Sequence, residues 1–275
     1  MSHQDHLGRT ETRTDTLHAS QLAQMAATLD RGAPPESLPP LWHWMLFNPW
    51  VRPGEIGPDG HPRRGTFLPA DDELPRRMYA GGRVRLHGPL RPGETATRLS
   101  TITRVEEKSG TTGRLLFVTV RHEITGPLGL ALTEEHDIVY RGLAGAAAKP
   151  GAPFADPMGS FSRTVVPDPV LLFRYSALTG NGHRIHYDRS YVTEVEGYPG
   201  LIVHGPLITT LLLDLLRRQL PDAQVAAFDF RAVRPTFDTH PFSVHGKPSA
   251  DGKTIELWAQ DHEGWLTMQG TATLA

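Results

Sequence analysis

The sequence predicts an α+β protein made of two similar halves, in which antiparallel strands wrap around a helix. Its length of 275 residues suits two fused domains of about 130 residues each. An apolar helical pattern that begins at Pro206 is followed by four strand-like patterns. In addition, the stretches around Pro89 and Pro235 both give a strand, a proline-led turn and another strand. We therefore expect a duplicated unit.

Composition excludes several classes of protein. With 39% apolar and 21% charged residues, the chain can build a core. A net charge of −2 gives no global field for a polyanion, so nucleic acid is not an expected partner. The absence of cysteine excludes disulfides and thiolate chemistry and suits a reducing cytoplasm. The most apolar run, residues 201–216, is interrupted by His204 and Asp214 and is too short to span a bilayer. We expect a cytoplasmic protein without a membrane partner.

The domain plan follows from shifts in composition. Residues 1–14 are polar and are expected to be a disordered tail. The first unit is predicted over residues 15–145. Residues 146–158, which are small and rich in proline, have the composition of a linker. The second unit is predicted over residues 159–275.

The first unit begins with a helix predicted over residues 20–30, because apolar side chains recur at helical spacing and Gly32 follows. Residues 32–75 are dense in Pro, Gly and aromatic residues, which predicts a long loop that packs on the rest of the fold. Alternating and β-branched patterns then predict an antiparallel meander. Its strands are expected at residues 82–87, 94–108, 114–125 and 130–140.

The second unit should be a helix wrapped by a sheet. A strand is predicted at residues 160–166, a short helix at 167–179 and a long helix at 206–219. Four further strands are expected at residues 223–233, 241–247, 254–261 and 265–274.

The loop between the two helices of the second unit carries the best candidates for catalysis. His186 has an unperturbed pKa of about 6.5, so it can accept and return a proton near neutrality. Asn181 lies five residues earlier, and its amide could hold a water molecule against the imidazole without competing for the proton. The alternative is that Asn181 and Gly182 form an ordinary turn and that His186 is a packed histidine.

Gly205 is the second candidate, because Pro206 marks the first turn of the long helix. The N–H of Gly205 should be unpaired at the positive end of that helix, and a residue without a side chain lets a carbonyl approach closely. Such a donor can stabilise an oxyanion. A Gly-Pro pair also begins many ordinary helices, so the functional interpretation depends on its combination with the loop of His186.

Other sites are less well supported. His183 and His186, with His204 nearby, could bind a metal ion, but their spacing is undemanding, and we predict no metal. No dinucleotide fingerprint or phosphate-binding loop is present. The arginines at positions 76, 77, 83 and 85 are expected on a solvated strand face rather than in a dedicated phosphate clamp.

Two segments around His186, ALTGNGHRIHYD and YPGLIVHGPL, resemble the MaoC-like hydratases and dehydratases of the hot-dog fold. They are most similar to the double hot-dog branch that contains mesaconyl-C4-CoA hydratase, itaconyl-CoA hydratase and mitochondrial-type 3-hydroxyacyl-thioester dehydratases. The segments GHPRRGTFLP and PRRMYAGGRVRLHGPLRPGE are similar to the N-terminal domain of that branch. The resemblance covers most of residues 15–275.

The resemblance implies a double hot-dog in which each half wraps a helix and the first half has lost its catalytic loop and forms the substrate tunnel. His186 would be the catalytic base and Gly205 the oxyanion donor. The general R-specific hydratases carry aspartate where this chain has Asn181, whereas the double hot-dog branch often carries asparagine, so His186 would be the principal base. The expected partner is an acyl-CoA or acyl-carrier-protein thioester, with no cofactor, and a homodimer is possible.

The implied reaction is the reversible hydration of a 2-enoyl-CoA, or dehydration of a 3-hydroxyacyl thioester. The branch favours a small branched or C4–C5 dicarboxylic substrate such as mesaconyl- or itaconyl-CoA, whose carboxylate would need a cation. Candidate substrate-binding residues are His183, Arg184, His204, Arg174 and Tyr79, besides the arginines at 76–85. An acyl-CoA thioesterase and a non-catalytic acyl-thioester-binding module are the alternatives, since both can use the same fold.

Overall fold

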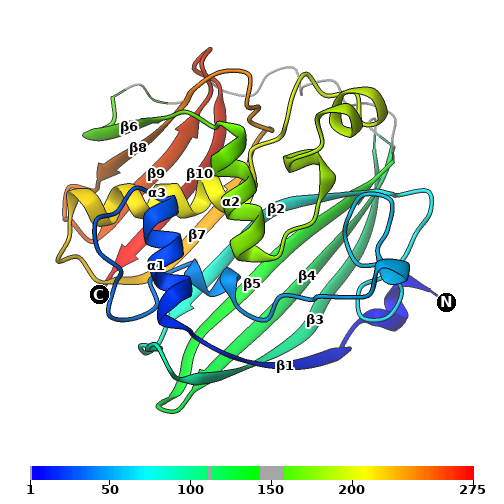
Figure 1. Ribbon diagram of the computed structural model, residues 1–275, viewed down its shortest axis with the longest axis horizontal. Coiled ribbons are helices and arrows are strands. Elements are labelled where there is room, and N and C mark those ends of the chain that lie inside the picture. Colours follow the sequence, from blue (N-terminus) through cyan, green and yellow to red (C-terminus); the bar gives the residue numbers. More distant parts are fainter. Residues whose placement is uncertain (1, 111–112, 143–155, 157) are drawn as a thin grey trace.

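The computed structural model describes residues 2–110, 113–142, 156 and 158–275. Within them, ten strands form one antiparallel sheet in the order β1-β3-β4-β5-β2-β7-β10-β9-β8-β6 (Figure 1). The strands are β1 (Thr10–Thr16), β2 (Arg76–Leu86), β3 (Thr95–Gly110), β4 (Gly113–Gly126), β5 (Gly129–Arg141), β6 (Phe161–Val165), β7 (Val225–Ala232), β8 (Phe242–Pro248), β9 (Thr254–Gln260) and β10 (Leu266–Leu274). The α-helices are α1 (Ala19–Thr28), α2 (Pro169–Thr179) and α3 (Gly205–Gln219).

The two halves of the sheet have the same topology, which confirms the predicted α+β double hot-dog. Numbered within its own half, each set of five strands lies in the order first, third, fourth, fifth, second. The two similar strand-turn-strand patterns of the sequence lie at equivalent places in the two halves, because Pro89 lies between β2 and β3 and Pro235 lies between β7 and β8. The halves meet where β2 pairs with β7. That pairing joins two five-stranded sheets into one.

Helix α3 is the central helix of the second half and lies across β8, β9 and β10 (Figure 1). Every residue from Leu207 to Leu216 is buried, so the helix is covered on all sides. This burial explains why the segment is so apolar in sequence. Edge strand β6 also contacts α3, and α2 packs on the helix through Tyr175, whose hydroxyl lies 3.4 Å from that of Thr210.

The one buried charge of α3 is compensated by three arginines. The carboxylate of Asp214, which is 0% exposed, is bound by Arg31, Arg163 and Arg218. These arginines come from the end of α1, from β6 and from α3, so the cluster connects the two halves. A buried carboxylate is stable only when it is paired in this way.

Substitution of Asp214 by Ala is expected to destabilise the protein by about 3 kcal/mol, because three partly buried guanidinium groups would then face one another without a counter-ion. Urea unfolding followed by tryptophan fluorescence measures this change. Substitution of the exposed Asp229, which pairs with Arg85 on the surface, is the matched control and should cost less than about 1 kcal/mol. Equal losses in the two variants would contradict the role given to Asp214.

The first half lacks a comparably long helix. Helix α1 has 10 residues, and it packs against α2 of the second half. The predicted aromatic loop supplies much of the remaining core, since Trp42 and Phe47 are buried between these elements. Trp50, by contrast, is 84% exposed and does not pack.

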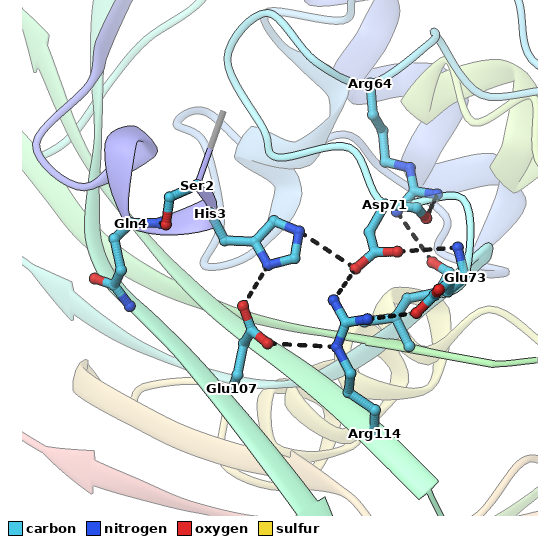
Figure 2. Close-up of polar contacts among 9 residues, drawn as sticks. Ser2, His3, Gln4, Arg64, Asp71, Glu73, Glu107 and Arg114 are labelled. Carbon is cyan, nitrogen blue, oxygen red and sulfur yellow. Dashed lines mark hydrogen bonds and ion pairs between the residues drawn. The ribbon is translucent and has the colours of Figure 1, made fainter.

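The prediction of a disordered tail over residues 1–14 is wrong. Residues His3–His6 form a 3-10 helix, and β1 pairs with β3 from Thr10 to Thr16. Figure 2 shows how the end is held: His3 contacts Asp71 and Glu107, and Arg114 binds both of these carboxylates. The strand was missed because TETRTDT has no apolar alternation, and it is held mainly by backbone pairing.

Other boundaries differ less. Strand β2 begins at Arg76 rather than at residue 82, because its first residues pair with β5. The linker predicted over residues 146–158 lies almost wholly outside the described residues. In the part of the chain that the structure describes, no helix is long and apolar enough to cross a membrane.

Candidate active site

The loop that carries His186 begins where α2 ends. Asp168 caps the start of α2 by accepting from the N–H groups of Val170 and Leu171, and Gly180 ends the helix in the left-handed conformation with φ 58°. The chain then turns through Asn181 into a short 3-10 helix, Arg184–His186. The predicted helix and loop are therefore both present, and they direct His186 into the interior.

The His186 ring is held in one tautomer. Its Nδ1 lies 2.7 Å from the carbonyl oxygen of Ile202, which can only accept, so Nδ1 carries the proton and Nε2 has a free lone pair. Burial lowers the pKa of His186 to about 4, although the hydrogen bond to Ile202 acts in the opposite direction. The imidazole is consequently neutral at pH 7 and can act as a base.

His204 fixes the position of this ring relative to α3. The two imidazoles stack with centroids 3.7 Å apart and an interplanar angle of 18°. His204 is fully buried, its Nε2 lies 2.7 Å from the Ser176 hydroxyl, and it immediately precedes Gly205. Because the stacked rings are nearly parallel, their nitrogens do not converge on one point, which disfavours a metal ion shared by His186 and His204.

Asn181 is positioned by the same loop. Its Oδ1 accepts from the backbone N–H of His183 at 3.0 Å, while its Nδ2 makes no hydrogen bond with any described residue. The side chain is half-buried. The free amide hydrogens can therefore donate to a bound water or substrate oxygen, but the group cannot take a proton.

Gly205 is the first residue of α3, one residue before the predicted start, and no described residue accepts a hydrogen bond from its N–H. The space that a side chain would need is filled by Tyr79, since an added Cβ would lie 2.8 Å from Tyr79 Cδ1. Glycine is thus required here for contact with an aromatic ring of β2. Tyr79, from the first half, covers the helix start from the second.

A buried polar cluster lies behind Tyr79. His136 packs edge-on against the Tyr79 ring at 4.9 Å, and the Glu134 carboxylate accepts from His43 Nε2 and Trp44 Nε1. Burial raises the pKa of Glu134, but the hydrogen bond from His43 and the neighbouring histidines outweigh it and keep the carboxyl ionised. His43 is therefore part of a buried hydrogen-bonded cluster as well as an aromatic cluster.

A loop of the first half packs directly on the loop that carries His186. The backbones of Gly60 and Gly182 approach so closely that a Cβ on Gly60 would lie 1.9 Å from the Gly182 oxygen. The N–H of Arg184 donates to the carbonyl of Asp59 at 2.8 Å, and the His61 and His183 rings lie 4.3 Å apart. Asp59, Gly60 and His61 were not predicted as site residues from the sequence. The signal was present, because Gly60 begins the segment GHPRRGTFLP.

Asp59, His61 and His183 bring their ligand atoms within 4.8 Å of one another, a geometry that could hold a cation. His61 Nδ1 already donates a hydrogen bond to the Asp59 carboxylate at 3.1 Å. Burial is the main cause that lowers the pKa of both histidines, and the positive charge of Arg77 lowers them further. A neighbouring guanidinium disfavours a metal ion for the same reason that it disfavours an imidazolium.

The remaining predicted binding residues are not all brought together. Arg184 binds Asp188 and stacks on Tyr191, so its charge is already compensated. Arg174 is exposed on α2. His183 lies beside the candidate base, with ring centroids 5.5 Å apart. The structure therefore brings together His183, His186, His204, Gly205 and Tyr79, while Arg174 is exposed on the surface of α2.

Comparisons with known proteins agree with this geometry. The family model for hydroxyacyl-thioester dehydratase type 2 matches residues 41–238, which is more than half of the chain. The chain is 45% identical to mesaconyl-C(4)-CoA hydratase of Chloroflexus aurantiacus over 98% of this chain and 96% of that protein.

Solved structures show the same fold. A MaoC-like dehydratase from Phytophthora capsici matches with a TM-score of 0.73 at 18% identity, over 98% of this chain and 96% of that one. A Mycobacterium tuberculosis protein described as a double hot-dog matches with a TM-score of 0.56 at 16% identity, over 98% and 96% of the two chains.

Proposed function

We propose a substrate from the premise that this chain belongs to the hydroxyacyl-thioester dehydratase type 2 family and is an enoyl-thioester hydro-lyase. The protein hydrates a small dicarboxylic 2-enoyl-CoA of the mesaconyl-C4-CoA type. The substrate comes from the relative with 45% identity. The observation that supports the mechanism is the stacking of His186 on His204. Because His204 immediately precedes Gly205 in the chain, this stacking holds the neutral His186 imidazole near the free N–H of Gly205.

In this mechanism the thioester oxygen accepts from the Gly205 N–H at the positive end of α3, which withdraws electrons from the double bond. His186 Nε2 removes a proton from water, and the water oxygen bonds to C3. The negative charge that develops on the thioester oxygen is stabilised by Gly205. His186 then returns the proton to C2 of the enolate, so one base completes the addition. Dehydration is the reverse sequence.

Asn181 has a positioning role in this proposal. With Oδ1 occupied by the His183 N–H, its amide hydrogens donate to the water oxygen and direct the water proton toward His186. A carboxylate at this place could act as a second base, whereas an amide cannot. The chain therefore depends on His186 alone for proton transfer.

Purified protein tests the proposal with a panel of CoA thioesters, by following the loss of absorbance of the conjugated thioester. We expect rapid hydration of mesaconyl-C4-CoA and slower hydration of crotonyl-CoA, which lacks the carboxylate. Release of free CoA from a saturated acyl-CoA would instead identify a thioesterase. Binding without turnover of any thioester would identify a non-catalytic module. We further propose that the protein works in the cytoplasm and that CoA is the carrier.

The pH profile is expected to report the buried base. Because burial lowers the pKa of His186 to about 4, the base is unprotonated above that value, and kcat/KM should be flat above roughly pH 5 and fall as the pH drops through about 4. Crotonyl-CoA is the appropriate substrate, since it has no carboxyl group that titrates in this range. Circular dichroism at each pH checks that the protein stays folded. A fall in kcat/KM with a midpoint at the ordinary histidine pKa of about 6.5 would contradict the assignment of the buried His186 as the base.

A further inference from the structure

The four arginines of β2 differ in what they contact. Arg76 binds Glu196, Arg83 binds Glu135 and Asp137, and Arg85 binds Asp229. Arg77 makes no ion pair or side-chain hydrogen bond with any described residue, although it is half-buried. A half-buried guanidinium without a carboxylate partner is costly unless a bound anion compensates it.

The strand register places Arg77 on the face of the sheet that meets the catalytic loop. Side chains two residues apart on a strand share a face, so Arg77 lies on the same side as Tyr79, which covers Gly205. About 7 Å separates the two positions along the strand. An arginine can cover that distance, and in a mesaconyl-type substrate only C2 and C3 lie between the thioester carbon and the free carboxylate.

A second polar group without a partner among the described residues lies opposite Arg77. Tyr140 is its register partner on β5, and directly opposite residues in an antiparallel pair share a face. Tyr140 is fully buried, and its hydroxyl has no hydrogen-bond partner among the described residues. An unsatisfied buried hydroxyl of this kind is uncommon and calls for a ligand or water. Arg64 lies over the Tyr140 ring, so a second positive charge is close.

Electrostatic interactions connect Arg77 and Tyr140 to the loop of His186. The charge of Arg77 acts on His61 and His183, the two rings beside His186, and helps to keep both neutral. The Asp59 carboxylate also lies beside His61, and it already accepts a hydrogen bond from that ring. Arg77, Arg64 and the Tyr140 hydroxyl, which is unpaired among the described residues, thus supply positive charge and a donor close to two neutral imidazoles, which favours an anion over a cation.

We propose that Arg77, with the Tyr140 hydroxyl beside it, binds the free carboxylate of the substrate and makes the enzyme specific for carboxyl-bearing 2-enoyl-CoA thioesters. This inference rests on the proposed function. Arg77 is a specificity-determining residue that takes no part in proton transfer. The guanidinium forms a two-point contact with the carboxylate, which also fixes the orientation of C3 toward His186.

The test compares two substrates and two inhibitors. The Arg77→Met variant should lose about 100-fold or more in kcat/KM for mesaconyl-C4-CoA and stay within about threefold of wild type for crotonyl-CoA. Succinyl-CoA and butyryl-CoA, which do not react, should inhibit wild type with different strength, and Arg77→Met should abolish that difference. Arg77→Lys, which keeps the charge without the planar fork, should lie between the two.

Controls separate specificity from structure. Arg85→Met removes the same charge from the same strand at a residue already paired with Asp229, and it should leave the substrate preference unchanged. Tyr140→Phe should lower the preference for the carboxylate by about tenfold without affecting crotonyl-CoA. Thermal unfolding of each variant checks the fold.

The outcomes distinguish the two proposals. If wild type hydrates mesaconyl-C4-CoA and Arg77→Met does so equally well, or loses both substrates in equal proportion, the assignment of Arg77 is wrong while the reaction stands. If wild type hydrates no carboxyl-bearing enoyl-CoA, the substrate class and Arg77 assignments fail together. A metal site would also overturn the proposed anion site. It would appear as saturable inhibition of wild type by Zn²⁺ that is lost when Asp59 is substituted and is unchanged in Arg77→Met.

Discussion

Substitution of His186 by Ala is expected to lower kcat by about 10²- to 10⁴-fold while the protein stays folded. The physical reason is that His186 Nε2 is an unprotonated imidazole nitrogen, and the ring is held next to the start of α3 by a hydrogen bond from Nδ1 to Ile202 and by stacking on His204. Neither Asn181 nor the Gly205 N–H can accept the proton. Stopped assays with the substrate that wild type turns over best measure the loss.

The control for this variant is His245→Ala. His245 is also a mostly buried histidine stacked on an aromatic ring, that of Trp258, but it lies on β8 away from the loop of His186. Both variants should lose stability to a similar, modest extent, and only His186→Ala should lose turnover. Near-normal kcat in His186→Ala would mean that another group moves the proton, and the mechanism would have to be abandoned.

Substitution of Gly60 by Ala should reduce kcat/KM by roughly 100-fold without touching any group that takes part in the reaction. A Cβ at this position would lie 1.9 Å from the Gly182 carbonyl oxygen, and the backbone has φ +92°, which disfavours any side chain. The catalytic loop must therefore move away from the loop of Asp59 and His61. A displacement of about 1 Å at a reacting group can cost that much in rate.

Gly54→Ala is the matched control, because Gly54 lies in the same long loop with open space around it. Its activity should equal that of wild type. A crystal structure or amide hydrogen exchange over residues 180–188 would show whether the loop has shifted in Gly60→Ala. Unchanged activity in Gly60→Ala would mean that the contact with Gly182 does not set the position of His186.

Much of this site could be predicted from the sequence because its chemistry lies in one continuous segment. The apolar helix after Pro206 and the loop that contains His186 are adjacent in the chain, so local patterns were enough to pair His186 with Gly205. The contribution of the first half could not be found in that way. Gly60 and Tyr79 reach the site through the pairing of β2 with β7 and through a loop without regular structure, and neither leaves a periodic pattern.

The same distinction explains the errors in the fold. Helix α3 was predicted within one residue because it is apolar on all sides, whereas β1 consists of polar residues held mainly by backbone pairing with β3. Arg77 could not be ranked among the arginines of β2 from sequence, because the difference lies in which neighbours already carry a compensating charge. That information comes only from the assembled sheet.

The junction between β2 and β7 has a consequence for how such an enzyme can diversify. After a gene duplicates and fuses, one copy can keep the proton-transfer machinery under strict selection while the other accumulates changes. In the function proposed for this chain, the first half supplies the wall against which the acyl group rests. New substrate ranges can then arise through substitutions in residues 57–79 alone, and a directed-evolution library confined to that segment should yield altered acyl preference with the turnover chemistry intact.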